Sequence, residues 1–437
     1  MNANATLTPE KVYEQYIKNA LNKSSAIELL ISIIENSEKI DLRIQGIQEL
    51  ELVGADDNRA FHFLEQILLS DSIEEVRRQA AISLKRVFRN KSLDPMSWAL
   101  KHEESPSPLK VIYKTLMEII NNLNKQDTEE SKRILIDQIN RIDQIDFKIA
   151  VNNLCLNKSL EKVNIDSLAD ILKNFFSYIY LRNTLWRIKF EIQECRILKI
   201  NYPHGNLQEF PEALKNLSSL EVIELTYNTI RRIPKWIGKL KKLKRISLNS
   251  NFSFIKLPHS LGQLKNLKEL SLWNNKVKFL PKSIGTLESL EFLNLRVNQL
   301  EEIPKTIGNL ESLKVLDIYD NRLKKLPSTI GSLRSLEKLI LNGNQLKSIP
   351  STIGSLSSLK YLDLEDNELT QIPKSLGLLK SLVYLNLSRN QLSSLPNTIG
   401  LLPNLKELYL GSNNIIMYPQ TLKLLERNDV KIYYESY

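Results

Sequence analysis

The 437-residue sequence is poor in the residue types that build reactive centres. It contains only two cysteines, four histidines and thirteen glycines. The histidines are scattered, at His62, His102, His204 and His259, and none stands in a metal-ligand spacing such as His-Glu-x-x-His. Neither a Gly-x-x-x-x-Gly-Lys phosphate loop nor a Gly-x-Ser-x-Gly nucleophile elbow occurs. The sequence therefore predicts a non-enzyme without metal or cofactor, with a composite active site assembled across the chain as the alternative.

Long apolar runs are also missing. The first residues, Met1 to Thr6, show no basic segment followed by an apolar core, and no apolar run approaches the length of a membrane span. We therefore expect neither an export signal nor a membrane span. A hydrophobic content of 42% with 25% charged residues is typical of a globular protein, and the length leaves room for two or more domains.

One 23-residue phrase recurs nine times between Leu220 and Asn413. Its asparagine returns every 23 residues, with one step of 24, at Asn228, Asn251, Asn275, Asn298, Asn321, Asn344, Asn367, Asn390 and Asn413. Leu-x-Leu at positions 4 and 6 alternates as a short strand does, and the asparagine at position 9 can bond the backbone of neighbouring coils where the chain turns. A proline at position 15 ends the strand before a short return segment. Because one coil cannot bury its own apolar positions, the period predicts stacked coils.

This pattern resembles the leucine-rich repeat family. The phrase Ile-Pro-x-x-Ile-Gly-x-Leu is similar to the 23-residue class of Ras-suppressor and Scribble-type proteins, plant Ras-group repeats and bacterial repeat proteins. The resemblance implies an α/β solenoid of about ten coils with a curved parallel sheet. Extracellular members usually close their ends with disulfide clusters, whereas this chain has only Cys155 and Cys195, so we expect a reducing, cytoplasmic compartment.

The region before the repeats predicts helices. Apolar residues recur at helical spacing through residues 8–37, 41–53, 60–68, 76–87, 109–123, 128–142, 145–155 and 165–192. We expect Asp41 to cap one of these helices and Gly54 to end it. The sequence pattern from Asp71 to Leu84 is similar to that of HEAT repeats, whose short helices stack in pairs. Proline-rich residues 91–108 predict a loop with a short helix near Trp98.

Two domains follow from this division. An all-α HEAT-like domain is expected over residues 1–193 and the solenoid over 194–437, beginning with a degenerate coil at Cys195 whose strand buries Leu198 and Ile200. The apolar stripe of 165–192 is expected to cover the open first coil, because the core at a solenoid end otherwise faces water. The opposite end is expected to be closed by Leu422, Leu424, Leu425, Val430, Ile432 and Tyr433.

Positions 3, 5, 7 and 8 of each coil predict columns on the concave sheet face, with strands about 4.8 Å apart. Aromatic side chains step through these columns at Trp273, Phe292, Tyr319, Tyr361, Tyr384 and Tyr409. Acidic side chains gather between them at Asp317, Asp320, Asp363, Glu365, Asp366 and Glu368. The run 363–368 lacks the glycine and the spacing of a calcium loop. Exposed aromatics are common interface anchors, so the columns predict an acidic groove that binds a protein or peptide with basic residues at the contact.

The residues selected for this site are Trp273, Phe292, Asp317, Tyr319, Tyr361, Asp363, Glu365 and Tyr384. The simpler interpretation is that aromatics suit strands and that charges keep a surface hydrated.

A basic patch forms the second candidate site. Residues 196–437 hold 34 Lys and Arg against 21 Asp and Glu, a net charge of +13, and no acid occurs between Glu224 and Glu269. The patch comprises Arg231, Arg232, Lys235, Lys241, Lys242 and Arg245. It could meet nucleic acid, an anionic membrane surface or an acidic partner. Alternatively, it pairs with acids of the helical domain such as Glu74 and Glu75, or it is a solvated face.

The sequence as a whole favours a cytoplasmic scaffold or adaptor that binds proteins. The resemblance to the Ras-suppressor class implies small GTPases or their regulators as partners. Nucleic acid is disfavoured, because single-strand binders combine basic residues with stacked aromatics and the helical domain shows no such combination.

Overall fold

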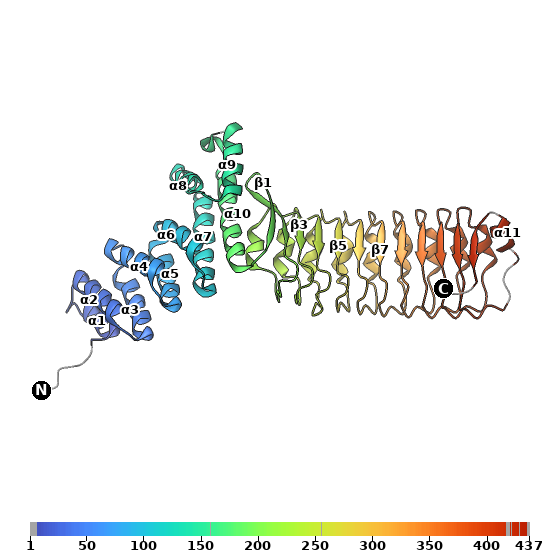
Figure 1. Ribbon diagram of the computed structural model, residues 1–437, viewed down its shortest axis with the longest axis horizontal. Helices are drawn as coiled ribbons and strands as arrows, with labels where there is room; N and C mark the ends of the chain where they lie inside the picture. Colours follow the sequence, from blue (N-terminus) through green and yellow to red (C-terminus); the bar gives the residue numbers. More distant parts are fainter. Residues whose placement is uncertain are drawn as a thin grey trace. The chain divides into compact units, whose positions relative to one another are not determined.

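The protein divides into two compact units, which are described separately. The computed structural model describes residues 7–157, 159–254, 256–416, 420, 422–427 and 429–434, without the side chains of residues 154–157. Unit 1 comprises Met1–Trp186 and Ile192–Arg196, and unit 2 comprises Arg187–Glu191 and Ile197–Tyr437. Unit 1 is helical, and unit 2 is a solenoid of short strands and turns (Figure 1).

Unit 1 is built from helices of 9 to 21 residues joined by short turns. The α-helices are α1 (Pro9–Ile17), α2 (Lys23–Asn36), α3 (Ile40–Val53), α4 (Asn58–Ser70), α5 (Glu74–Phe88), α6 (Leu93–His102), α7 (Pro106–Gln126), α8 (Glu129–Asn140), α9 (Ile145–Asn157) and α10 (Ile165–Thr184). Two 3₁₀ turns join them, η1 (Arg89–Ser92) and η2 (Leu160–Lys162).

The helices of unit 1 pack as successive pairs. Helices α3, α5, α7 and α10 each contact the next in that order, while α2, α4, α6 and α8 pack on them (Figure 1). Helix α4 buries one apolar stripe, formed by Phe63, Leu64, Ile67 and Leu68. This arrangement follows from the 3.6-residue spacing of the apolar residues.

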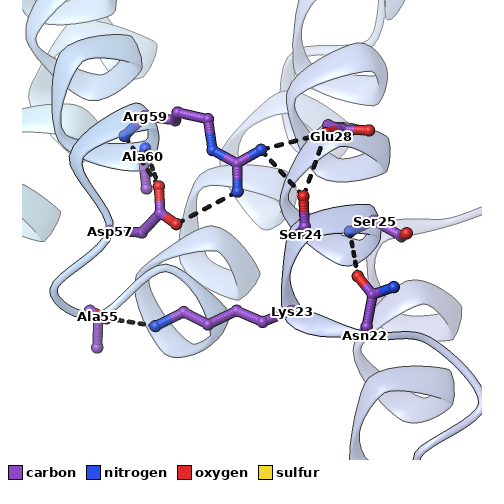
Figure 2. Close-up of polar contacts among 9 residues, drawn as sticks. All are labelled: Asn22, Lys23, Ser24, Ser25, Glu28, Ala55, Asp57, Arg59 and Ala60. Atoms are coloured by element: carbon purple, nitrogen blue, oxygen red, sulfur yellow. Dashed lines mark hydrogen bonds and ion pairs between the residues drawn. The ribbon is translucent and has the colours of Figure 1, made fainter.

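Polar side chains fix the starts of α2 and α4, which Figure 2 shows side by side. The Asn22 carboxamide accepts the Ser25 N–H at 2.8 Å, and the Asp57 carboxylate accepts the N–H groups of Arg59 and Ala60 at 2.8 and 3.3 Å. Side-chain caps of this kind contribute about 1 kcal/mol each. The Arg59 guanidinium also reaches Glu28 of α2 at 3.1 Å (Figure 2), a surface ion pair that adds little.

Unit 2 repeats a strand and a 3₁₀ segment. Its strands are β1 (Lys189–Gln193), β2 (Arg196–Asn201), β3 (Val222–Glu224), β4 (Arg245–Ser247), β5 (Glu269–Ser271), β6 (Phe292–Asn294), β7 (Val315–Asp317), β8 (Lys338–Ile340), β9 (Tyr361–Asp363), β10 (Tyr384–Asn386), β11 (Glu407–Tyr409) and β12 (Lys431–Tyr433). The 3₁₀ segments are η3 (Glu212–Asn216), η4 (Lys235–Lys239), η5 (His259–Gln263), η6 (Lys282–Thr286), η7 (Lys305–Asn309), η8 (Ser328–Ser332), η9 (Ser351–Ser355), η10 (Lys374–Leu378) and η11 (Asn397–Leu401), and a short helix α11 (Leu422–Arg427) follows.

The strands form one sheet in chain order, and from β2 to β12 they are paired in parallel (Figure 1). Strands stack on strands and 3₁₀ segments on 3₁₀ segments, which leaves two turn-lined edges between them. The core lies inside the coils, where the leucines of the repeat are fully buried. The repeat glycine allows close stacking: a Cβ built at Gly331 lies 2.2 Å from the Thr352 carbonyl oxygen of the next coil.

The repeat asparagine joins neighbouring coils, as the sequence predicts. In Asn321, which is 6% exposed, Nδ2 donates to the carbonyl oxygens of Leu295 at 2.9 Å and Ile318 at 3.2 Å. Its Oδ1 accepts the Leu300 N–H at 3.0 Å. Equivalent bonds recur from Asn228 to Asn413. Each carboxamide therefore satisfies buried backbone groups of two coils at once.

Three expectations about unit 1 are wrong. The short helix expected near Trp98 is confirmed as α6, but the loop expected over the rest of residues 91–108 is wrong: these residues are mainly helical, because Pro95, Pro106 and Pro108 occupy first turns of α6 and α7, where helix N–H groups lack partners anyway. The last helix ends at Thr184 rather than 192, since Lys189–Gln193 alternates in exposure with the period of a strand. Asp41 lies inside the first turn of α3 rather than at its cap, whereas Gly54 is the C-cap.

The ends of unit 2 also differ in detail. In β2 the buried residues are Ile197 and Ile200, while Leu198 is half-buried. Leu422, Leu425 and Val430 are buried at the other end. Leu424 points to solvent and is 43% exposed, and Ile432 and Tyr433 are half-buried in β12.

Replacing a repeat asparagine should destabilise the solenoid strongly. Asn321→Ala leaves the Leu300 N–H buried without a partner and removes one of the two amide donors to the Leu295 carbonyl, which keeps the Asn298 amide at 3.0 Å, so we expect a loss of roughly 1–3 kcal/mol in the free energy of unfolding. Urea unfolding followed by circular dichroism measures the loss. Asn309→Ala removes an exposed amide and should change the free energy by no more than about 0.5 kcal/mol. Equal effects of the two substitutions would show that the bridging bonds are not the cause.

Candidate functional site

The exposed side of the sheet, called the sheet face, is organised by in-register pairing. One column runs Val315, Lys338, Tyr361, Tyr384 and Glu407, and a second runs Asp317, Ile340, Asp363, Asn386, Tyr409 and Tyr433. The residue between the two columns on each strand from β7 to β11 is a leucine with no exposed surface. Alternation along a strand therefore directs both columns to the same side of the sheet.

Four tyrosines form a continuous ladder on the strands from β9 to β12. The Tyr361 and Tyr384 rings stack with centroids 4.2 Å apart and planes 5° apart, and Tyr409 and Tyr433 stack at 4.3 Å and 8°. Tyr384 and Tyr409 connect the two pairs at 5.3 Å. All four rings are half-buried, because each covers its neighbour. Tyr433, predicted from the sequence only as part of the end cap, is thus also a member of the ladder.

The remaining predicted aromatics lie apart from the ladder. Phe292 is on β6, with β7 and β8 between it and Tyr361. Trp273 follows β5 and is half-buried, with its indole N–H buried and lacking an acceptor among the described residues. Tyr319 is covered by the Arg296 guanidinium, 4.3 Å from the ring centroid.

Asp363 is the most deeply placed carboxylate of the site. Only 7% of the residue is exposed, and burial raises the pKa of its carboxyl to about 6. Its oxygens accept the Glu365 N–H at 3.1 Å and the Tyr361 hydroxyl at 3.4 Å. Burial likewise raises the pKa of Asp317, although Arg296 and Lys338 oppose the shift.

Cations that are not among the predicted site residues accompany the acids. The Lys338 ammonium lies 4.4 Å from the Tyr361 ring centroid, and Arg389 Nε lies 3.6 Å from Glu365 Oε1. Glu365 Oε2 also accepts the Asn386 amide at 3.0 Å. Lys338 lies in the same column as Tyr361, so the sequence pattern reveals it once basic as well as acidic residues are assigned to the columns. The groove is therefore mixed in charge rather than uniformly acidic.

The opposite end of the sheet face carries paired charges instead of rings. Lys199 lies 3.0 Å from Glu224, and Arg245 lies 3.9 Å from Glu224 and 2.7 Å from Glu269. These ions neutralise one another across the strands from β2 to β5. The N-terminal coils are consequently less suited to a charged ligand than the tyrosine end.

The basic patch is dispersed over the coil. Arg245 lies on the sheet face and Lys235 begins η4. Arg231 and Arg232 lie on the edge that follows the strand, whereas Lys241 and Lys242 lie on the opposite edge. All six side chains are exposed.

The patch also has counter-ions within unit 2. Besides the pairs of Arg245, Arg232 approaches Glu209 at 3.3 Å. The structure thus does not gather these residues into one surface.

Neither surface shows the groups of a metal centre. Within the described part of the chain, His, Cys, Asp and Glu nowhere gather in threes that could hold a metal ion. The arrangement of rings, amides and carboxylates on an open sheet offers stacking and hydrogen bonding to a ligand.

Family models match the coils that carry these columns. Residues 274–359 match a leucine-rich repeat region, and residues 206–252, 334–392 and 357–415 match a leucine rich repeat. The repeats belong to the leucine-rich repeat family. All of these matches lie within residues 206–415, in the leucine-rich repeat unit. No curated protein matches the chain.

Several solved leucine-rich repeat structures are similar. The ectodomain of the membrane receptor kinase GASSHO1/SCHENGEN3 from Arabidopsis thaliana, solved with Casparian strip integrity factor 2, is 31% identical over 50% of this chain and 30% of its own, with a TM-score of 0.46. A TDR receptor is 27% identical over 60% of this chain and 45% of its own, with a TM-score of 0.49. A leucine-rich repeat protein of Leptospira interrogans is 27% identical over 54% of this chain and 83% of its own, with a TM-score of 0.29. This chain spans less than half the length of either receptor.

None of the described helices combines the length and the apolar character that crossing a bilayer requires.

Substituting Asp363 should stabilise the leucine-rich repeats near neutral pH. Since its pKa in the folded state, about 6, exceeds the ordinary 3.8, the folded protein holds the proton more tightly, and stability falls as pH rises from about 4 to 6. At pH 7 the ionised carboxylate costs about 2–3 kcal/mol, which Asp363→Asn should recover.

Chemical unfolding of wild type and Asp363→Asn at pH 4 and pH 7 measures how the free energy of unfolding changes with pH. Asp320→Asn, which removes an exposed carboxylate from the same face, is the matched control and should not recover the stability that Asp363→Asn recovers at pH 7. If wild type and Asp363→Asn lose stability equally as the pH rises, the Asp363 carboxylate is not the group that titrates.

Proposed function

We propose that this protein is a non-catalytic scaffold that binds an extended protein or peptide segment across the strands from β8 to β12 of its sheet face. The observation that carries the proposal is the stacked Tyr361–Tyr384 pair with the buried Asp363 carboxylate beside it. An ionised carboxylate held where burial raises its pKa lowers stability. Such groups concentrate at functional sites.

The dimensions and chemistry of this region favour a peptide. Strands about 4.8 Å apart give five strands a span of about 19 Å, which six extended residues match at about 3.3 Å each. The tyrosine rings supply rigid contact area. Glu365 and Asn386, which are hydrogen-bonded to each other, supply polar groups at the same strands. Asp363 and Glu365 favour a ligand with a basic residue at this contact, whereas Lys338 and Arg389 limit the number of basic residues that fit.

The resemblance to Ras-suppressor repeats makes small GTPases or their regulators one partner class for the scaffold. A cytoplasmic location rests on cysteine use: Cys195 is fully buried, and the side chain of Cys155 lies outside the described residues. The alternative of nucleic-acid binding through the basic patch is weakened by the distribution of that patch over two edges and the sheet face.

Peptides selected from a random library on the full chain test the docking site. We expect enrichment of basic residues and at least a tenfold loss of affinity in Tyr361→Ala/Tyr384→Ala, because interface aromatics typically contribute about 2 kcal/mol or more. Titration calorimetry measures the affinities. Phe252→Ala/Phe279→Ala is the matched control, since it removes two exposed rings away from the sheet face and should leave affinity unchanged.

Circular dichroism checks that each variant is folded. A further variant, Tyr361→Phe/Tyr384→Phe, keeps the stacked rings while removing both hydroxyls, and so separates the contribution of the rings from that of the hydroxyls. Peptides that bind the alanine double variant as tightly as wild type would place docking elsewhere on the chain.

A further inference from the structure

One turn-lined edge of the first three coils carries cations and exposed rings together. This edge follows the strands β3, β4 and β5 and precedes the 3₁₀ segments η4, η5 and η6. We call it the basic edge, and its members are Arg231, Arg232, Phe252, Lys256, Lys276, Lys278 and Phe279. Every one of these side chains is exposed.

Backbone pairing holds the three turns side by side. Arg232 and Lys256 form an isolated parallel bridge between the first and second turns. The Lys276 N–H donates to the Phe254 carbonyl oxygen at 3.0 Å, joining the second turn to the third. The buried side chains of Ile233, Leu257 and Leu280 stand beneath these turns. The exposed residues therefore form rows on a common, rigid edge.

The two phenylalanines depart from the pattern of the repeat. Phe252 is 55% exposed and Phe279 is 56% exposed. The position of Phe252 holds Gln299, Arg322, Gln345, Glu368 and Gln391 in later coils. That of Phe279 holds Glu302, Lys325, Ser348, Gln371 and Ser394. Since polar residues satisfy the fold at both positions, the rings are not required for folding, and both occur in the coils that lack acids on this edge.

The cations of the basic edge are largely unbalanced. Arg232 lies 3.3 Å from Glu209, and both side chains are about 70% exposed. An ion pair so exposed to water is weak. Arg231, Lys256, Lys276 and Lys278 form no ion pair with another described residue. After the third turn, the next acidic residues on this edge are Glu301 and Glu302 of the following coil. The surface thus holds a local excess of positive charge.

We propose that the basic edge binds an anionic lipid surface. Phenylalanine side chains insert at the boundary between headgroups and acyl chains, while Lys and Arg attract anionic headgroups. The backbone pairing of neighbouring turns holds both groups together on one edge. Single-stranded nucleic acid fits less well, because its binders place aromatics and cations along a groove, whereas these residues stand on protruding turns.

Co-sedimentation of the full chain with phosphatidylcholine vesicles, with and without phosphatidylserine, tests the proposal. Wild type should bind only the anionic vesicles, and less at high salt. Lys256→Glu/Lys278→Glu should lower the partition coefficient by about fivefold or more for each cation replaced. Phe252→Ala/Phe279→Ala leaves the charge unchanged and should lower it on the order of tenfold.

The matched control is Lys324→Glu/Lys347→Glu, which makes the same charge change at exposed positions of the same edge in later coils. It should retain most of the binding. The proposal is overturned if wild type ignores anionic vesicles, if the control loses as much as Lys256→Glu/Lys278→Glu, or if the phenylalanines have no effect. Binding of single-stranded RNA through Phe252 and Phe279, in the absence of vesicle binding, would also overturn it.

Discussion

The buried carboxamide of the repeat asparagine is the constraint on which the leucine-rich repeat unit depends. Each one bonds carbonyl oxygens of its own and the preceding coil and accepts an N–H from that preceding coil, as Asn321 does with Leu295 and Leu300. A carboxamide has few ways to satisfy all of its groups in a buried place, so it sets the spacing between coils. Strand register follows from that spacing. The residues that vary between coils are consequently held in straight columns, which is what allows a sheet face to act as a site.

The repeat made this unit predictable from sequence, whereas the helical unit offered weaker signals. A period of 23 with leucine, asparagine and proline in fixed places specifies the strand and both turns of every coil. Proline in the first turns of α6 and α7 was ambiguous, because the same residue opens helices and interrupts them. The strand after Thr184 was missed for a related reason: its alternation covers only Lys189–Gln193, directly after a long apolar stripe.

The composition of the sheet face was predictable, but the contacts between its side chains were not. Column positions identify which residues share the surface, and they placed Tyr361, Tyr384 and Asp363 together. They do not reveal that the rings stack face to face, that Lys338 covers Tyr361, or that Asp363 is almost wholly buried. These depend on side-chain packing within a few ångströms. The six residues of the basic patch, close in sequence, lie on different sides of the coil because they occupy different positions of the repeat, which the period itself specifies.

The one irregular step of the repeat shows how the solenoid accommodates an extra residue. Asn251 and Asn275 are 24 residues apart. The Asn275 carboxamide accepts the N–H of Asn251 itself, whereas in a regular coil, such as that of Asn321, the carboxamide accepts the N–H two residues after the preceding asparagine. Phe254 fills the core with no exposed surface, while the lengthened turn carries Phe252 outward. The inserted residue is thus absorbed at an edge without loss of strand register between β4 and β5. The lengthened turn belongs to the basic edge, which therefore includes the place where the repeat departs from its period.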